Sequence, residues 1–281
     1  MRILLVYCNS AHQITVPIGI TQIRSGLLRS GHEVELFHTT HYKQRERSAE
    51  EIRAHALQFP DPGKLFYEST DMCEDFVELT RKFQPDMIGF STLEPTHEVF
   101  LMLLNSVESY VEKSNCKVAV GGAYPRLAPD LISKVRHVDI IATSESEDTF
   151  PELCQKIENK DNYFDVPGYW LKDETLLTTW KVNPAKTLVD INTLPPLDSA
   201  PFGDKFMMKP MMGEMRKTIS LEIARGCPYK CTYCADSVMA EQTKSIGNYL
   251  RVKSPDNIAQ ELELLVSQHD PAFIYKLSET F

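Results

Sequence analysis

The 281-residue chain has no long hydrophobic run, because no apolar stretch approaches the roughly 18 residues that a membrane-spanning helix needs. It has few positive charges: 30 Lys and Arg stand against 39 Asp and Glu, for a net charge of −9. This balance argues against duplex nucleic acid as the main partner. No cleavage-site pattern follows the short apolar segment at residues 2–7, so no secretory signal is expected. These absences predict a cytoplasmic protein of one or two domains, without a membrane or nucleic-acid partner.

Cysteines are also few, but three of the seven fall in the segment RGCPYKCTYC at residues 225–234. Cytoplasmic thiols stay reduced, so clustered cysteines indicate metal or redox chemistry rather than disulfides. A structural zinc site uses four ligands, and its cysteines usually come as two pairs. Three thiolates on a four-iron cluster, in contrast, leave one iron free to bind a substrate or cofactor. The triplet Cys227, Cys231 and Cys234 therefore favours an iron–sulfur cluster.

The first 160 residues alternate between strand-like and helix-like segments. Strands are expected at residues 2–7, 32–37, 86–91, 117–122 and 138–143. Helices are expected at residues 18–29, 70–83 and 96–111, and in a segment that ends near residue 157. Such alternation implies right-handed crossovers and an open parallel sheet of five strands.

A different pattern follows residue 160. A small hairpin is expected at residues 167–180, with its turn near Asp173, and a proline-rich connector at residues 194–202. A second β/α pattern then begins with a strand at residues 218–224, which leads into the cysteine segment. Ser254 and Pro255 have the residue types of a helix start, and that helix is expected to end near residue 269. A last strand is expected at residues 272–278.

The cysteine segment resembles the motif of the radical S-adenosylmethionine superfamily, in which CxxxCxxC follows a strand and an aromatic residue precedes the last cysteine. The resemblance implies that the triplet holds a 4Fe–4S cluster, whose open iron binds S-adenosylmethionine. An external one-electron reductant of the flavodoxin or ferredoxin type would then drive release of a 5′-deoxyadenosyl radical. The resemblance also implies that Tyr233 contacts the adenine and that Glu279 lies near the methionine moiety. Ser278 departs from type, since relatives usually carry an acid there.

The N-terminal half resembles the cobalamin-binding fold of one radical S-adenosylmethionine subgroup. Ser91-x-Leu93 and Gly121-Gly122 match the elements that make room for the cobalamin nucleotide tail, where bare glycine backbone can approach a ligand closely. Both elements follow strands, and open α/β sheets bind ligands beyond the carboxyl ends of their strands. The DxHxxG element is absent. His12 lies in the corresponding loop without its aspartate and glycine, so an ordinary loop histidine is expected rather than a cobalt ligand.

Together the two resemblances imply an α/β protein in three parts. A Rossmann-like cobalamin-binding domain would span residues 1–160, a linker with the hairpin residues 161–215, and the start of a radical S-adenosylmethionine partial (β/α) barrel residues 216–281. The implied function is a cobalamin-dependent radical enzyme that acts on a small molecule. Methyl transfer from methylcobalamin to an unactivated carbon is its most common reaction, although cyclisations and rearrangements also occur. Because such a barrel needs about six β/α units and two are visible, the chain is expected to be truncated and inactive.

Two alternative functions stay open. A methylthiotransferase would hold a second cluster on three further cysteines, and Cys8, Cys73 and Cys116 could be assigned to it. However, Cys116 precedes its strand and so falls at the opposite sheet edge from Cys8. On the residues alone, each of these cysteines is better explained as a small buried hydrophobe. The other alternative is a non-catalytic cofactor-binding fragment, which the small number of barrel units favours.

Overall fold

The computed structural model describes residues 1–11, 16–44, 67–173, 175, 179–197, 200–211 and 214–279. By their contacts they form two compact units. Unit 1 comprises Met1–Gln13 and Gly26–Pro184, and unit 2 comprises Ile14–Ser25 and Ala185–Phe281. Helix α1 (Ile18–Arg29) therefore contributes its first two turns to unit 2 and its last turn to unit 1. The domain boundaries expected from the sequence stay a prediction.

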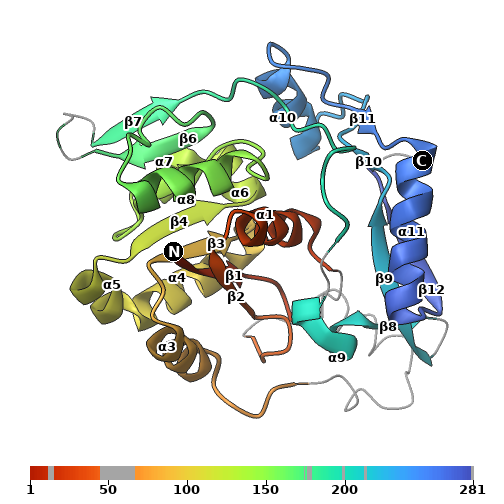
Figure 1. Ribbon diagram of the computed structural model, residues 1–281, viewed down its shortest axis with the longest axis horizontal. Helices are drawn as coiled ribbons and strands as arrows, with labels where there is room; N and C mark the ends of the chain where they lie inside the picture. The colour runs from red at the N-terminus through yellow and green to blue at the C-terminus, as the bar shows by residue number, and fades with distance from the viewer. Residues whose placement is uncertain are drawn as a thin grey trace. The chain divides into compact units, whose positions relative to one another are not determined.

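Unit 1 is built on a seven-stranded sheet with the strand order β2-β1-β3-β4-β5-β6-β7 (Figure 1). Five strands are parallel, as expected: β1 (Arg2–Tyr7), β2 (Glu33–His38), β3 (Met87–Ser91), β4 (Lys117–Gly121) and β5 (Ile140–Ala142). The expected hairpin forms from β6 (Tyr169–Lys172) and β7 (Trp180–Asn183). Because β6 pairs antiparallel with β5, the hairpin extends the sheet.

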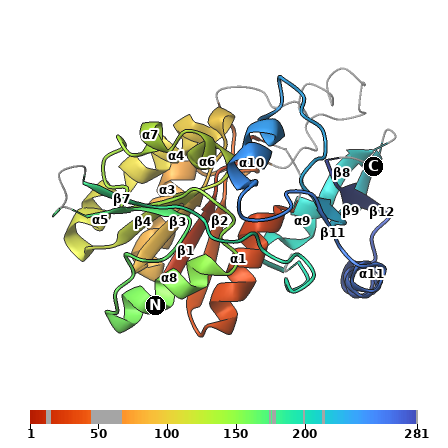
Figure 2. The same ribbon diagram turned by 90° about the horizontal axis from the view of Figure 1, so that it is seen from above.

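Helices cover both faces of this sheet. Figure 2 shows α3 (Met72–Phe83) and α4 (His97–Ser106) on one side and α8 (Thr149–Asn159) on the other. The helix expected at residues 96–111 is in fact two, α4 and α5 (Glu108–Ser114), because Val107 leaves the helical conformation with φ −110° and ψ 11°. Short helical turns complete the connections: η2 (Glu94–Thr96), α6 (Ala123–Leu127) and α7 (Pro129–Ile132).

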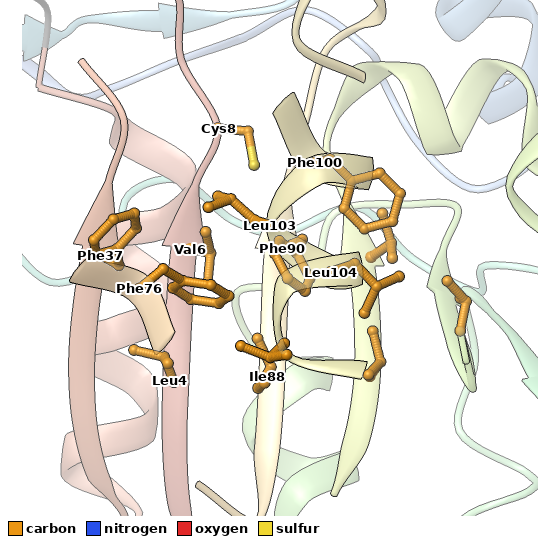
Figure 3. Close-up of a cluster of buried hydrophobic side chains, with 14 of the residues drawn as sticks. Leu4, Val6, Cys8, Phe37, Phe76, Ile88, Phe90, Phe100, Leu103 and Leu104 are labelled. Carbon is orange, nitrogen blue, oxygen red and sulfur yellow. The ribbon is translucent and has the colours of Figure 1, made fainter. Parts of the chain in front are cut away.

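Alternate side chains of the central strands point to opposite faces, so each strand is buried on both. Figure 3 shows one such layer, in which Leu4 and Val6 of β1 and Ile88 and Phe90 of β3 face side chains of α3 and α4. The helix side chains in this layer are Phe76, Phe100, Leu103 and Leu104. Each contributes about 1.5–3 kcal/mol through burial. The double burial explains the continuous apolar runs of β1, β3 and β4. Because these strands pair in parallel, their carboxyl ends lie at one edge of the sheet.

Unit 2 contains a three-stranded sheet of order β12-β9-β8, formed by β8 (Met208–Met211), β9 (Glu214–Glu222) and β12 (Phe273–Leu277). Helix α11 (Pro255–His269) connects β9 to its parallel neighbour β12, after the short pair of β10 (Ala224–Arg225) and β11 (Arg251–Val252). The predicted cap of α11 is confirmed, since Ser254 Oγ accepts a hydrogen bond from Asn257 N at 3.2 Å. Three helical elements of this unit were not predicted: η3 (Ala200–Phe202), α9 (Gly203–Met207) and α10 (Ala235–Thr243). Strands β8, β10 and β11 were not predicted either. Among the described residues, no helix combines the length and apolarity needed to cross a bilayer.

Candidate functional site

The three clustered cysteines lie in the loop that runs from the carboxyl end of β9 to the start of α10. All three thiols are partly buried, and Cys234 is the N-cap residue of α10. Two hydrogen bonds shape the loop: Cys234 N donates to Cys231 O at 3.1 Å, and Ser237 Oγ donates to the same oxygen at 2.7 Å. A thiolate at a helix N-terminus is electrostatically favoured, because the helix dipole is positive there. The loop therefore presents three cysteines at the sheet edge where α/β proteins bind ligands.

The described side chains include one close group of possible metal ligands, which is separate from the cysteine triplet. Zinc–sulfur bonds of about 2.3 Å in a tetrahedral site would bring the sulfurs within about 4 Å of one another. Among the His, Cys, Asp and Glu side chains in the described part of the chain, one group of three has its ligand atoms within 4.8 Å of one another. This group consists of Glu108, Glu112 and His137. The cysteine triplet is more widely spaced.

Gly226, directly before the first cysteine, is fixed by the backbone of Tyr249. Its φ is +86°, and a Cβ at this position would lie 2.3 Å from Tyr249 O. The hydroxyl of the same tyrosine donates a hydrogen bond of 2.6 Å to Asp236 Oδ1, and Asp236 Oδ2 lies 3.9 Å from Cys234 Sγ. Sequence reasoning missed both Asp236 and Tyr249, because an aspartate after a cysteine motif and a tyrosine 13 residues later form no recognisable pattern.

A partly buried ion pair holds the start of the loop. Arg225 Nε donates to Glu222 Oε1 at 2.9 Å, and Arg225 Nη2 donates to Glu222 Oε2 at 3.2 Å. The same Nη2 also donates to Gln22 Oε1 at 3.1 Å, within unit 2. Such bidentate charged hydrogen bonds are among the strongest in proteins. Strand β9 and the first residues of the loop are thus tied together just before Cys227.

The two residues expected to contact S-adenosylmethionine are both exposed. Tyr233 is 90% exposed. Glu279 follows β12, whose Leu277 pairs in parallel register with Glu222 of β9, so Glu279 is at the same sheet edge as the cysteine loop. Burial raises the pKa of the Glu279 carboxyl, and the charge of Asp236 adds to this effect.

In unit 1 the loops after β1, β3 and β4 meet at the carboxyl edge of the sheet. Cys8 N donates to Ser91 O at 3.0 Å, and Thr92 N donates to Gly121 O at 3.0 Å. The strand order reverses between β1 and β3, and open α/β sheets bind ligands at such a point. The structure therefore brings Ser91, Leu93, Gly121 and Gly122 together at this edge, and Leu93 is partly exposed there.

The backbone requires glycine at position 122 but not at position 121. Gly122 has a φ of +110°, and a Cβ there would lie 2.3 Å from Thr92 O. A Cβ on Gly121 would make an ordinary contact of 3.5 Å with Ala142 Cβ. The need for glycine at position 122 thus comes from the close approach of the two loops, a reason that the sequence alone does not show.

A histidine at the same edge offers a polar atom to a ligand. His97 Nδ1 is buried and has no hydrogen-bond partner among the described residues. Burial lowers the pKa of His97, against an opposing effect of Glu98. The imidazole packs against Tyr124, with ring centroids 5.1 Å apart, and Tyr124 follows the Gly121-Gly122 pair. An imidazole nitrogen without a protein partner fits a site for a ligand with polar groups.

The cysteines considered for a second cluster are not brought together. Cys8 follows β1 at the carboxyl edge of the sheet, and Cys116 directly precedes β4 at the amino edge. Both are buried, and burial raises the pKa of both thiols, that of Cys116 to about 12. Cys73 lies on α3, and its thiol pKa is also raised by burial. The assignment of these three to one cluster is therefore wrong, and His12 lies outside the described residues.

Comparisons with known proteins point to one group. A family model for the B12 binding domain matches residues 64–154. The chain is 23% identical over 209 residues to an uncharacterized methyltransferase of Pyrococcus horikoshii, a match that covers 74% of the chain and 42% of that protein. It is 24% identical over 228 residues to the anaerobic magnesium-protoporphyrin IX monomethyl ester cyclase of Cereibacter sphaeroides. This match covers 77% of the chain and 35% of that protein. It is 24% identical over 250 residues to the hopanoid C-3 methylase of Methylococcus capsulatus. This match covers 88% of the chain and 39% of that protein. The chain thus spans less than half the length of these relatives.

Solved structures share the fold. The radical S-adenosylmethionine methyltransferase TsrM from Kitasatospora setae matches with a TM-score of 0.64 and 14% identity, over 99% of the chain and 47% of that protein. The cobalamin-dependent S-adenosylmethionine radical enzyme OxsB, with aqua-cobalamin and S-adenosylmethionine bound, matches with a TM-score of 0.71 and 19% identity, over 100% of the chain and 34% of that protein. The chain therefore matches a B12 binding domain over residues 64–154 and shares its fold with these solved radical S-adenosylmethionine proteins.

Proposed function

We propose that this chain serves a cobalamin-dependent radical S-adenosylmethionine enzyme that transfers a methyl group to an unactivated carbon of a small molecule. The observation that carries the proposal is the loop of three partly buried cysteines at the end of β9, in a chain whose other unit contains a B12-binding domain. Neither feature alone would suffice, because each occurs with many kinds of chemistry. Their combination in one chain is what the methylase and methyltransferase relatives support.

In unit 2, Cys227, Cys231 and Cys234 would hold the 4Fe–4S cluster, with Tyr233 and Glu279 contacting S-adenosylmethionine. When bound, the cluster supplies one electron for cleavage of S-adenosylmethionine, and cobalamin supplies the methyl group. The protein residues position these groups. The ion pair of Glu222 and Arg225 fixes the start of the loop, and the α10 N-terminus favours the thiolate of Cys234.

In unit 1, Ser91, Leu93, Gly121 and Gly122 would border the nucleotide tail of cobalamin. The reversal of strand order at this edge supports the assignment, as does the buried His97 Nδ1 beside it. The close contact of Gly122 with Thr92 sets the path of both loops. The role of Gly122 would therefore be to shape the pocket rather than to touch the ligand.

Ring closure is the second candidate reaction. The cyclase relative matches the chain about as well as the two methyl-transferring relatives do. Both reactions would need the same cofactors and an external one-electron donor of the flavodoxin or ferredoxin type. Substrate identity therefore separates them, while the cluster and cobalamin tests apply to both.

Anaerobic reconstitution tests the cluster directly. We expect about four irons and four sulfides per chain, together with the broad visible absorbance of such clusters. Replacing any one of the three loop cysteines with alanine should abolish cluster retention. Cys73→Ala, which removes a partly buried thiol on α3, is the matched control and should keep the full iron content. Tight stoichiometric zinc without sulfide would refute the proposal, and about eight irons per chain would favour a methylthiotransferase.

A further inference from the structure

Asp236 has a position that the proposed cofactor chemistry does not yet explain. It is 9% exposed, two residues after the last cysteine, in the first turn of α10. One carboxylate oxygen accepts the hydrogen bond of 2.6 Å from the Tyr249 hydroxyl. The other lies 3.9 Å from Cys234 Sγ, which donates to it while the sulfur is a thiol. Burying a carboxylate is costly, so its retention beside the cysteines calls for a reason.

The first consequence is mechanical. Tyr249 touches the loop at both ends, since its carbonyl oxygen packs on Gly226 and its hydroxyl holds Asp236. Residues 227–234 therefore lie between two positions that Tyr249 holds, Gly226 and Asp236. The contact at Gly226 leaves no room for a Cβ, so the first point cannot move without moving Tyr249. The hydrogen bond to Asp236 fixes the second point, and with it the start of α10 and Cys234.

The second consequence is electrostatic. Once the Cys234 sulfur binds iron it carries no proton, and Asp236 then faces a negatively charged sulfur instead of a donor. Reduction adds one electron to the cluster, from an external one-electron donor, without making or breaking a bond. A buried carboxylate nearby disfavours this added negative charge and so lowers the reduction potential. A low potential makes the reduced cluster a stronger electron donor.

We propose that Asp236 is a positioning residue for the cluster, which anchors Cys234 through Tyr249 and keeps the reduction potential of the cluster low by its charge. This inference rests on the proposed function, because it requires the cluster to bind at the three cysteines. It assigns the two effects to separable groups. The anchor needs the Tyr249 hydroxyl, and the potential needs the charge of Asp236.

Two variants separate these effects. Asp236→Asn keeps an oxygen that can accept from Tyr249 but removes the charge, so iron content should stay near that of the unmodified chain. Its midpoint potential, from anaerobic titration followed by electron paramagnetic resonance, should rise by at least about 59 mV, which is tenfold in the one-electron equilibrium. Tyr249→Phe keeps the charge but removes the anchor, so the cluster should lose iron several-fold faster on dilution, without a rise in potential. Asp256→Asn, an exposed aspartate in the first turn of α11, is the matched control and should change neither reading.

The two variants test the electrostatic role and the anchoring role separately. An Asp236→Asn midpoint equal to that of the control would overturn the electrostatic role, and unchanged iron loss in Tyr249→Phe would overturn the anchor. If Asp236→Asn does not fold, Asp236→Ser provides the uncharged variant, with the same rise expected. In either of these failures the unmodified chain still binds its cluster, so the proposed function stands. Failure of the unmodified chain to form any cluster would overturn both.

Discussion

At the scale of single residues, Gly122 has the most restrictive surroundings of the candidate cobalamin site. Gly122→Ala should destabilise unit 1 by about 2–4 kcal/mol, because the new Cβ would clash with Thr92 O in a left-handed backbone conformation. Urea denaturation followed by circular dichroism measures this loss. Gly121→Ala is the matched control and should cost less than about 1 kcal/mol, since its Cβ meets Ala142 at an ordinary distance. Equal costs for the two variants would contradict the explanation from loop contact.

His97 provides a second test at this scale. His97→Phe keeps a ring against Tyr124 but removes the buried Nδ1. We expect about fivefold weaker binding of cobalamin, equivalent to one lost hydrogen bond of about 1 kcal/mol, and unchanged binding of cobinamide, which lacks the nucleotide tail. Absorbance titration of both corrinoids measures the difference. His137→Gln, before β5 at the opposite sheet edge, is the control. Equal weakening for both corrinoids would exclude a contact between His97 and the tail.

At the scale of elements, the sequence predicted those whose pattern is local. The residues of β1, α1 and α11 matched their expected bounds, because apolar runs, a glycine after α1 and the Ser254-Pro255 pair mark them. The two-residue strands β10 and β11 were missed, since only their mutual pairing defines them. Helix α10 was missed because its N-cap is Cys234 rather than a residue with a good capping side chain. Likewise, no proline or glycine marks the break at Val107 between α4 and α5.

For the candidate site, too, the sequence predicted the residues that form local motifs and missed those brought together by folding. Sequence spacing indicated the three cysteines and the loops after β3 and β4, because motif residues are adjacent in the chain. The Glu222–Arg225 pair and the Asp236–Tyr249 contact depend on how the loop folds back on itself. His97 has no motif at all, and its buried nitrogen becomes visible only with the packing of α4 against Tyr124.

The cap of α11 gives a prediction at this scale. Ser254→Ala should destabilise unit 2 by about 1 kcal/mol, because it removes the side-chain acceptor for Asn257 N at the start of the helix. The backbone bond from Ser254 N to Asn192 Oδ1 would be retained. Ser267→Ala, near the end of the same helix, removes a hydroxyl that donates to Leu264 O within the helix and should cost less than about 0.5 kcal/mol. Thermal unfolding of both variants measures the difference, and similar melting temperatures would argue against the capping role.

At the scale of the whole molecule, the free energy of unfolding should depend on pH, because the buried His38 binds a proton less readily in the folded chain than in the unfolded chain. Burial, with a smaller effect of His41, lowers the pKa of His38 to about 4, below the ordinary value of about 6.5. Between these values the unfolded chain binds more protons than the folded chain, so stability is present above pH 6.5 and falls as the pH drops towards 4. The loss is at most about 3 kcal/mol. Chemical denaturation across this range should show the slope, and His38→Gln should flatten it. A slope unchanged in that variant would assign the effect to other groups.

The central position of β1 has a consequence for synthesis on the ribosome. Its two neighbours are β2, about 30 residues later, and β3, whose Met87 pairs with Ile3. The apolar strand β1 of the nascent chain therefore has one unpaired edge until the third strand has emerged, and open apolar edges recruit other chains. Translation pauses before residue 87 would thus prolong exposure to aggregation, whereas pauses after β4 would leave β1 paired on both sides. Chaperone crosslinking to stalled chains of graded length should accordingly fall between these two points.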